Sequence, residues 1–364
     1  MASNPPHDSA LATESLSERL REAARTAGFD LCGFAPAVTP PTYPRFLDWL
    51  DAGHAAGMSY LETRREAYAH PRGVLDGARS VVMLAMNYHN NSTDAGNTAP
   101  ISNSNSTGRV ARYAQIERDY HDILRQRLRS LCDWLAAERP GCVARGIVDT
   151  APLLERDFAR LAGLGWFGKN SLLINKMLGS WLFLAAIVTD LDLPADRPFA
   201  ASHCGTCTRC LDACPTDAFP EPYVLDARKC IAYWTIEHRG TIPDDVKPGL
   251  GDWLFGCDIC QEVCPWNRKA PQASDPAMAA RSDLSHLDAL ELLGLDDGQF
   301  KARFRGTPLD RPRLEGLQRN AAVVLGNRGD RSALPALREG LTHPHAAVRE
   351  ACQWAIAQIE SRTV

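Results

Sequence analysis

Eight of the twelve cysteines in this 364-residue chain lie between Cys204 and Cys264. The first four, in HCGTCTRCLDACP at residues 203–215, have the spacing C-x2-C-x2-C-x3-C-P. In a chain without a secretory signal, such crowded CxxC spacings indicate metal or redox chemistry rather than disulfides. The other four cysteines are scattered, and we expect them to be small buried apolar groups; they are Cys32, Cys132, Cys142 and Cys352.

The spacing favours iron–sulfur clusters. Three thiolates two residues apart can wrap one face of a 4Fe-4S cluster, while the fourth, before Pro215, reaches a second cluster. GCDICQEVCP at residues 256–265 repeats the later half of the motif, and Cys230 supplies a missing ligand. Zinc on four thiolates is the alternative, but it does not explain two Cys-Pro ends. We expect one cluster on Cys204, Cys207, Cys210 and Cys264, and a second on Cys214, Cys230, Cys257 and Cys260.

Two adjacent clusters form a path for electrons, so the remainder of the chain should hold their destination. Residues 14–195 alternate between helical and strand patterns, which indicates an α/β or α+β domain. We expect helices over 14–27, 117–139 and 152–162, and strands over 30–37, 79–89, 143–149 and 181–189. Residues 90–108 are rich in Ser, Asn, Thr and Gly and predict a mobile loop.

The C-terminal part has a different pattern. Residues 319–324 resemble residues 349–354 at a spacing of 30, which is typical of a short helical repeat. We expect these helices to cap the rest of the protein.

Charge and hydropathy narrow the location and the partners. The net charge is −4, so a nucleic acid would have to meet a local basic face. Residues 301–313 carry five basic residues and one acid, which fits either phosphate binding or a solvated surface. The apolar run 181–188 is too short to span a bilayer, and the first twenty residues lack a secretory or twin-Arg pattern. We therefore expect a cytoplasmic protein that contacts no membrane.

Two motifs in the first domain have competing interpretations. Residues 163–168 (GLGWFG) match a dinucleotide motif, but they follow a predicted helix, which indicates a turn or a close approach to a flat ligand. Asp149 ends a predicted strand ahead of Pro152; this pattern suits a helix start or a carboxyl group facing a ligand crevice. The mutase-type cobalamin motif D-x-H-x-x-G is absent, and residues 119–121 (DYH) come nearest to it.

A series of segments in fixed order resembles the epoxyqueuosine reductase family, cobalamin-dependent iron–sulfur enzymes of the last step in making queuosine in tRNA. The segments are ARSVVMLAMNYH, RYAQIERDYH, VDTAPLLER, GLGWFGKNSLLI, GSWLFLA, the two cysteine motifs, YWTIEHRG and QRNAAVVLGN. The resemblance covers residues 12 to 360. It departs from the family pattern at Tyr68, where an arginine is expected, and at Ala232, where a serine is expected.

The resemblance implies an α+β fold in several parts. A disordered N-terminus at 1–12 precedes a nitroreductase-like cobalamin domain at 13–197. A ferredoxin-type module with two 4Fe-4S clusters follows at 198–270, and a HEAT-like helical domain at 271–364. The implied partners are tRNA carrying epoxyqueuosine in the anticodon loop and an electron donor that the sequence does not identify, and the implied state is a monomer.

The resemblance also implies site residues. Asp149 would be the proton donor, with a pKa raised by burial beside the corrin. Cobalamin would be held by Arg112, Tyr113, Asp149, Lys169, Asn170, Leu173, Ser180, Leu184, Ala232 and Asp258. The tRNA would be met by Glu237, His238, Arg239, Arg303, Arg305, Arg311 and Arg313, with Lys301 in the same basic run.

Three rival functions stay open at this point. A related cobalamin and iron–sulfur reductase could act on a small molecule, as reductive dehalogenases do, although those usually carry a twin-Arg leader. An electron-transfer subunit would pass electrons to a partner without chemistry of its own. A zinc-stabilised nucleic-acid-binding scaffold would have neither redox cofactor.

Overall fold

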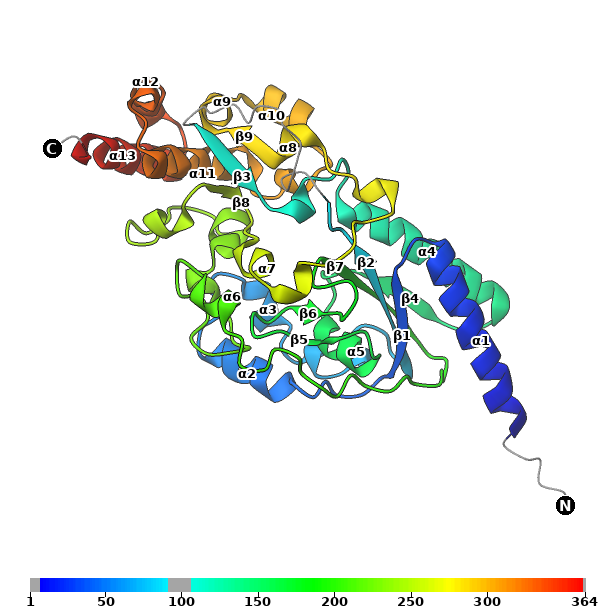
Figure 1. Ribbon diagram of the computed structural model, residues 1–364. Helices are drawn as coiled ribbons and strands as arrows, with labels where there is room; N and C mark the ends of the chain where they lie inside the picture. Colours follow the sequence, from blue (N-terminus) through cyan, green and yellow to red (C-terminus); the bar gives the residue numbers. More distant parts are fainter. Residues whose placement is uncertain (1–6, 91–105, 363–364) are drawn as a thin grey trace, which may run out of the picture.

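The structure is a computed structural model that describes residues 7–90 and 106–362. Its N-terminal helix and its C-terminal helices lie at opposite ends of the molecule, with the cysteine-rich segment between them (Figure 1). Among the described helices, none is long and apolar enough to cross a membrane.

A four-stranded antiparallel sheet forms the centre of the first part of the chain. Its order is β1-β2-β7-β4, with bounds Leu31–Pro36 (β1), Ser80–Asn87 (β2), Leu182–Thr189 (β7) and Ala144–Ile147 (β4). All of β2 is buried, because the sheet is covered on both faces and a central strand then needs apolar residues throughout. The four strands predicted from the sequence are therefore confirmed.

Helices cover the two faces of this sheet. On one face α1 (His7–Thr26) and α4 (Tyr120–Glu138) pack against alternate β2 residues such as Leu84. On the other face α5 (Glu155–Leu161) packs against the intervening residues such as Met83. The predicted helix at 152–162 begins three residues late, because residues 149–154 form the turns that carry Asp149.

Shorter elements complete this part: α2 (Tyr43–Asp51), α3 (Ser59–Thr63), β5 (Trp166–Phe167) and β6 (Leu173–Ile174). The GLGWFG motif lies at the β5–β6 pair. A Cβ atom on Gly165 would be 2.2 Å from the carbonyl oxygen of Ile174, so the glycine permits a close approach of two backbone segments. The motif therefore forms part of a hairpin and lacks the strand-to-helix context of a dinucleotide site.

A second, three-stranded sheet joins distant parts of the chain. β3 (Thr107–Val110) pairs in parallel with β8 (Trp253–Phe255) and antiparallel with β9 (His286–Asp288). The prediction of a loop through residue 108 is thus wrong at Thr107 and Gly108, because the strand's partners lie 140 or more residues away and leave no local signal. The rest of that loop, residues 91–105, lies outside the described residues.

Apart from β8, the regular elements of the cysteine-rich segment are short helices; they include α6 (Arg209–Asp212) and α7 (Ile259–Glu262). The chain then continues through α8 (Ser282–Ser285), α9 (Ala289–Leu293), α10 (Asp297–Phe304), α11 (Arg313–Arg328), α12 (Leu334–Glu339) and α13 (Ala346–Ser361). The repeat of 30 residues is confirmed, because Val324 on α11 and Trp354 on α13 belong to the same core.

The buried Arg319 fastens α11 to the cysteine-rich segment. Its guanidinium donates hydrogen bonds to the carbonyl oxygens of Trp234 (2.8 Å), His238 (3.1 Å) and Gly240 (2.8 Å). The neighbouring Asn320 donates to the carbonyl oxygens of Thr235 and Leu254. These bonds make the C-terminal helices and the cysteine-rich segment one packed unit.

Candidate active site

The eight clustered cysteines fall into two groups of neighbours. Burial raises the pKa of the Cys210 thiol to about 11, and the nearby Cys264, Cys204 and Cys207 add to the rise. The pKa of Cys264 is also raised by burial, with Cys204 and Cys207 contributing. Cys264 therefore joins the first three cysteines of HCGTCTRC, although it lies more than fifty residues further along the chain.

The second group is built in the same way. Burial raises the pKa of Cys230, and Cys214 adds to it, while the pKa of Cys257 is raised by burial and by Cys260 and Cys230. Cys260 is near both Cys230 and Cys210, so the two groups are adjacent.

This donor set fits two 4Fe-4S clusters. Within 7–90 and 106–362, no three His, Cys, Asp or Glu side chains are arranged to share a single metal ion. A 4Fe-4S cluster does not require three side chains around one metal ion, because each of its four thiolates bonds a different iron. The raised thiol pKa values describe neutral thiols, which lose their protons when metal binds.

The exposure and the electrostatics of Arg156 together indicate a crevice beside the second group. The side chain of Arg156 on α5 is exposed to solvent, yet burial lowers its pKa, and the nearby Cys260 and Glu155 partly offset this. A side chain that solvent reaches although protein surrounds it closely is expected to lie in a recess rather than on a convex surface. Tyr60 is similar, being 45% exposed with a pKa that burial raises to about 12. A recess with polar groups at its edge and a cluster cysteine beside it suits a large cofactor.

Asp149 belongs to an ordered network at this recess. The Tyr120 hydroxyl donates to Asp149 Oδ2 at 2.6 Å, and His121 Nε2 lies 2.8 Å from Asp149 Oδ1. The other ring nitrogen, His121 Nδ1, lies 2.7 Å from Asp119 Oδ1. The residues meet because α4 begins at Tyr120, with Asp119 as its N-cap, beside the end of β4.

The network sets the protonation of its members. Burial alone would raise the pKa of Asp149, but the hydrogen bonds from His121 and Tyr120 and the charges of His121 and Arg311 outweigh it and lower that pKa. The prediction of a raised pKa is therefore wrong. Burial likewise opposes protonation of His121, yet Asp119 and Asp149 raise its pKa to about 9. At neutral pH the imidazole is charged and the Asp149 carboxyl is ionised.

Beside Asp149, a raised carboxyl pKa belongs instead to Glu155. Burial and the nearby charge of Asp149 raise the pKa of Glu155 to about 8, and its Oε1 accepts a hydrogen bond from the Asp149 backbone N–H at 2.8 Å. Two carboxyl groups six residues apart thus have pKa values displaced in opposite directions, a pattern typical of acid–base sites.

Most residues predicted to hold cobalamin lie where the sheet domain meets the cysteine-rich segment. The Arg112 backbone N–H donates to Asp258 Oδ2 at 2.7 Å. Asn170 Nδ2 donates to the Cys260 carbonyl oxygen at 3.4 Å. Lys169 donates to the Gly205 carbonyl oxygen.

The remaining predicted residues differ in environment. Ser180 is buried and hydrogen-bonded to Gln261 and Asn267. Tyr113 packs against Phe183 and Phe255. Leu173 is buried in the sheet core, whereas Leu184 and Ala232 are half-buried. The structure thus brings Arg112, Asn170, Ser180 and Asp258 to one junction, with Leu173 set back from it.

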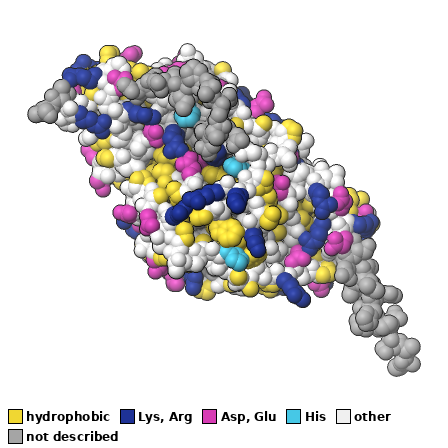
Figure 2. All heavy atoms as spheres, in the orientation of Figure 1, with side chains coloured by type: hydrophobic (Ala, Val, Ile, Leu, Met, Phe, Trp, Pro, Cys, Tyr) yellow, Lys and Arg dark blue, Asp and Glu magenta, His cyan; other side chains and the backbone are white. Residues whose placement is uncertain are grey.

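The residues predicted to meet tRNA are partly engaged within the protein. Arg311 Nη1 lies 3.5 Å from Glu237 Oε1, and Arg239 donates to the Arg311 carbonyl oxygen. His238 Nε2 lies 2.7 Å from the Thr241 carbonyl oxygen. Lys301 and Arg303 pair with Asp297 and Glu291, whereas Arg305 and Arg313 are exposed. The view in Figure 2 shows other Lys and Arg side chains among hydrophobic ones over the region of α7.

Several members of the site were not predicted: Tyr120 and His121 as partners of Asp149, together with Glu155 and Arg156. A signal is present, because RYAQIERDYH and VDTAPLLER contain all four residues. The DYH segment comes near to a cobalamin motif, but nothing local indicates that residues 119–121 face residue 149.

Two groups of four cysteines beside a crevice with an acid–base network define an iron–sulfur oxidoreductase. Family models match residues 203–267 (4Fe-4S double cluster binding domain), residues 69–150 (Epoxyqueuosine reductase QueG, DUF1730) and residues 313–364 (HEAT repeats). The chain is 42% identical to an epoxyqueuosine reductase of Xanthomonas campestris over 93% of its own length and 95% of the relative's. It is 36% identical to one of Escherichia coli, covering 95% and 90%.

Solved structures agree with this similarity. A crystal structure of epoxyqueuosine reductase with a tRNA-Tyr epoxyqueuosine-modified stem loop matches with a TM-score of 0.88 at 32% identity, covering 95% of this chain and 91% of the other. A Bacillus subtilis epoxyqueuosine reductase, with its catalytic aspartate loop swung out of the active site, matches with a TM-score of 0.87 at 31% identity over the same shares. This chain belongs to the epoxyqueuosine reductase family. The predicted combination of a mixed helix–sheet domain, a two-cluster module and HEAT repeats is confirmed.

Proposed function

We propose that this chain reduces epoxyqueuosine to queuosine at the wobble position of tRNA, with Asp149 delivering a proton to the epoxide oxygen. The curated relatives carry the name of this reaction across nearly the whole chain. The observation that carries the role of Asp149 is its double hydrogen bond to Tyr120 and His121 at the edge of the crevice.

The double-cluster segment and the family imply two 4Fe-4S clusters and cobalamin. The two neighbouring groups of thiols support Cys204, Cys207, Cys210 and Cys264 as ligands of one cluster, and Cys214, Cys230, Cys257 and Cys260 as ligands of the other. When bound, cobalamin supplies low-valent cobalt as a reductant, and the clusters supply electrons one at a time. The junction residues Arg112, Asn170, Ser180 and Asp258 would hold the corrin, together with Tyr113, Asp149, Lys169, Leu173, Leu184 and Ala232.

Conversion of an epoxide to an alkene takes two electrons and two protons and releases the oxygen as water. In this chain one proton is held on His121, whose Nε2 faces Asp149 Oδ1. As the C–O bond breaks and the oxygen becomes basic, His121 gives this proton to Asp149 and Asp149 passes it on to the oxygen, which leaves His121 neutral and Asp149 ionised again. The ionised carboxylate is thus a relay, and the imidazolium is the store.

The second proton has a source close by. Glu155, with its pKa near 8, is largely protonated at neutral pH and lies against the Asp149 backbone. Arg156 in the same recess gives a positive charge that can orient the substrate oxygen or an anionic group.

The remaining assignments follow from the same family membership. We infer a nitroreductase-like cobalamin domain at 13–197, a ferredoxin-type module at 198–270 and a HEAT-like domain at 271–364. We also infer a monomer in the cytoplasm that takes electrons from a separate donor. The exposed Arg305 and Arg313, together with residues 237–239, would contact the tRNA outside the crevice.

The test is turnover by protein reconstituted anaerobically with iron, sulfide and cobalamin, using tRNA that carries epoxyqueuosine. Asp149→Asn should keep both cofactors and lose about 10²-fold or more in turnover, because general acid catalysis contributes about that much. Asp245→Asn, at an exposed position, is the matched control. Normal turnover by Asp149→Asn would remove the proton-delivery role, and wild-type protein that takes up no corrinoid would favour an electron-transfer subunit.

A further inference from the structure

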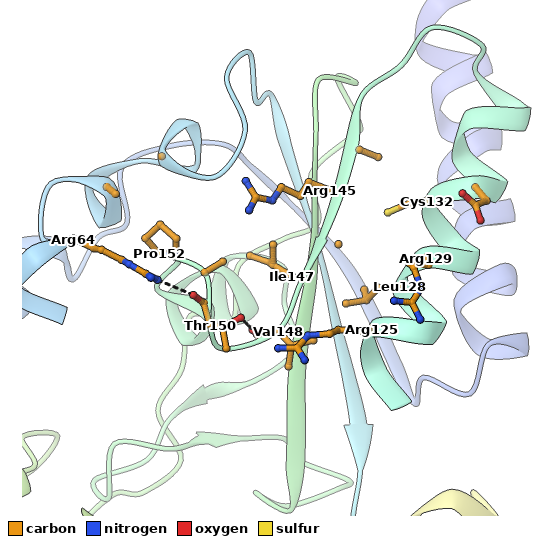
Figure 3. A pocket seen from close by; sticks show the side chains of 16 residues that line it. Arg64, Arg125, Leu128, Arg129, Cys132, Arg145, Ile147, Val148, Thr150 and Pro152 are labelled. Carbon is orange, nitrogen blue, oxygen red and sulfur yellow. Dashed lines mark hydrogen bonds between the residues drawn. The ribbon is translucent and has the colours of Figure 1, made fainter. Parts of the chain in front are cut away.

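A pocket of about 810 Å³ lies next to the Asp149 loop, between α4 and the edge strand β4 (Figure 3). Val148, Thr150 and Ala151 line it, whereas Asp149 itself does not. The pocket therefore shares a wall with the catalytic loop without belonging to the crevice. None of the residues assigned above to cofactors or tRNA lines it.

The lining is strongly basic in an acidic protein. Four arginines from three elements line the pocket, against one acid, Asp133; they are Arg64 after α3, Arg125 and Arg129 on α4, and Arg145 on β4. All four are solvent-exposed. Cys132 adds no negative charge, because burial raises the pKa of its thiol to about 11. Like charges gathered around a concave surface raise the local concentration of anions.

The carboxylates of the protein neutralise little of the charge of these arginines. Arg64 donates to the Thr150 carbonyl oxygen at 2.9 Å, and Arg145 donates to the Val74 carbonyl oxygen at 2.7 Å. Arg125 has a carboxylate only at 3.8 Å, on Asp122. In the part of the chain that the structure describes, Arg129 has no carboxylate within ion-pairing distance. In the basic run 301–313, by contrast, Lys301, Arg303 and Arg311 have acidic partners.

We propose that this arginine pocket binds a backbone phosphate of the tRNA substrate, beside the nucleotide that enters the crevice. The inference rests on the proposed function, because it takes the same tRNA as ligand. Guanidinium groups bind phosphate oxygens in pairs of hydrogen bonds, and four exposed ones suit a charge on a polymer passing over the surface. Since Arg64 also holds the carbonyl of Thr150, a phosphate bound here is linked directly to the loop that carries Asp149.

The test measures binding of epoxyqueuosine-bearing tRNA to the holoprotein by fluorescence anisotropy at several salt concentrations. Arg125→Ala and Arg129→Ala should fold normally, because alanine is a strong helix former. Each should raise the Kd by about 10-fold, as expected for the loss of a charge-assisted hydrogen bond. Each should also reduce the slope of log K against log salt by about 0.7 to 1. Arg197→Ala, an exposed arginine outside the pocket, should change neither quantity.

The outcomes separate this inference from the proposed function. If wild-type protein binds no tRNA, the proposed function itself fails. If wild-type protein binds tRNA and both variants bind it with the same Kd and salt slope, the pocket is not a phosphate site for tRNA. If the variants lose only a thermal shift caused by inorganic phosphate, the pocket holds a small anion and the proposal is overturned.

Discussion

The cluster module and the Asp149 network are neighbours in space but are specified in different ways. Seven of the eight clustered cysteines lie in two short motifs at 204–214 and 257–264, so their spacing already groups them. The network draws on residues 119–121, 149, 155 and 311, which belong to the start of a helix, the end of a strand, another helix and the C-terminal domain.

This difference has a chemical basis. A cluster needs a number of thiolates at suitable spacing, and short loops supply them locally. A proton relay needs particular pKa values, which depend on burial and on charges brought in from elsewhere. The first requirement can be read along the chain, whereas the second exists only after folding.

The largest effect is expected from loss of a cluster ligand, because each cluster draws cysteines from both motifs. Cys257→Ser should leave about four irons per chain rather than eight and abolish turnover, because one cluster loses a ligand. Iron and sulfide analysis with electron paramagnetic resonance measures this. Cys214→Ser should damage the cluster that also uses Cys230, Cys257 and Cys260. Cys264→Ser should damage the cluster that also uses Cys204, Cys207 and Cys210.

Cys142→Ala is the matched control, because this half-buried thiol lies outside both groups and its loss should leave the iron content unchanged. A Cys214→Ser protein whose spectrum matches that of Cys207→Ser would contradict the exchange of ligands.

The next effect concerns the proton store. His121→Gln should lower turnover by about 10²-fold. In wild-type protein kcat should fall as pH rises through about 9, where His121 loses its proton, and the variant should lack this alkaline limb. A pH–rate profile at saturating tRNA measures both, with the exposed His345→Gln as control. An unchanged alkaline limb in His121→Gln would assign that limb to another group.

The same pKa shift predicts a change in stability. Because the folded-state pKa of His121 lies above its ordinary value of 6.5, its stabilising contribution is complete below about pH 6.5 and is lost as pH rises through about 9. Urea unfolding of wild type and His121→Gln should be measured at pH 6 and at pH 9.5. The difference between their free energies of unfolding should be smaller at pH 9.5. A constant difference would mean that the imidazole is not charged in the folded protein.

A variant of Arg319 tests whether the C-terminal helices and the cysteine-rich segment form one packed unit. Arg319→Met should lower the free energy of unfolding by about 3 kcal/mol, because several buried carbonyl oxygens lose their donor. Arg338→Met removes an exposed ion pair with Glu360 and should cost less than about 1 kcal/mol. Equal urea midpoints for the two variants would contradict the anchoring role of Arg319.

The smallest effect belongs to Arg311, which reaches the network from the C-terminal domain. Its Nη2 lies 3.4 Å from His121 Nε2, and a cation at that distance opposes protonation of the imidazole. Arg311→Gln should therefore move the alkaline limb of the pH–rate profile to higher pH, with a change of about threefold or less in turnover at neutral pH. An alkaline limb that moves to lower pH in Arg311→Gln would contradict this effect of Arg311 on His121. Arg311→Lys keeps the positive charge and should leave the limb at its wild-type pH.

The sequence predicted the elements whose signals are local. The β2 strand was predicted over 79–89, α4 as a helix over 117–139, and the C-terminal helices as a repeat of 30 residues. The structure places all of these elements within or close to the predicted ranges. The start of α5 and the strand at Thr107 were misjudged, because turn geometry and pairing with distant strands override composition.

For the candidate site, the resemblance singled out Asp149, but its protonation was predicted with the wrong sign. Burial alone would raise its pKa, but the partners that overcome burial, Tyr120 and His121, lie 29 and 28 residues earlier in the chain. The raised carboxyl pKa belongs to Glu155 in the same VDTAPLLER segment.

By itself the sequence determined the two cysteine motifs, the order of the sheet, cluster and repeat segments, and the family to which the chain belongs, because short spacings and apolar periods are properties of neighbouring residues. The tertiary structure alone decided which carboxyl group is ionised, which residue stores the proton, and where four arginines meet behind the catalytic loop. Electrostatic free energies depend on distance and solvent access, and neither is fixed until the chain has folded.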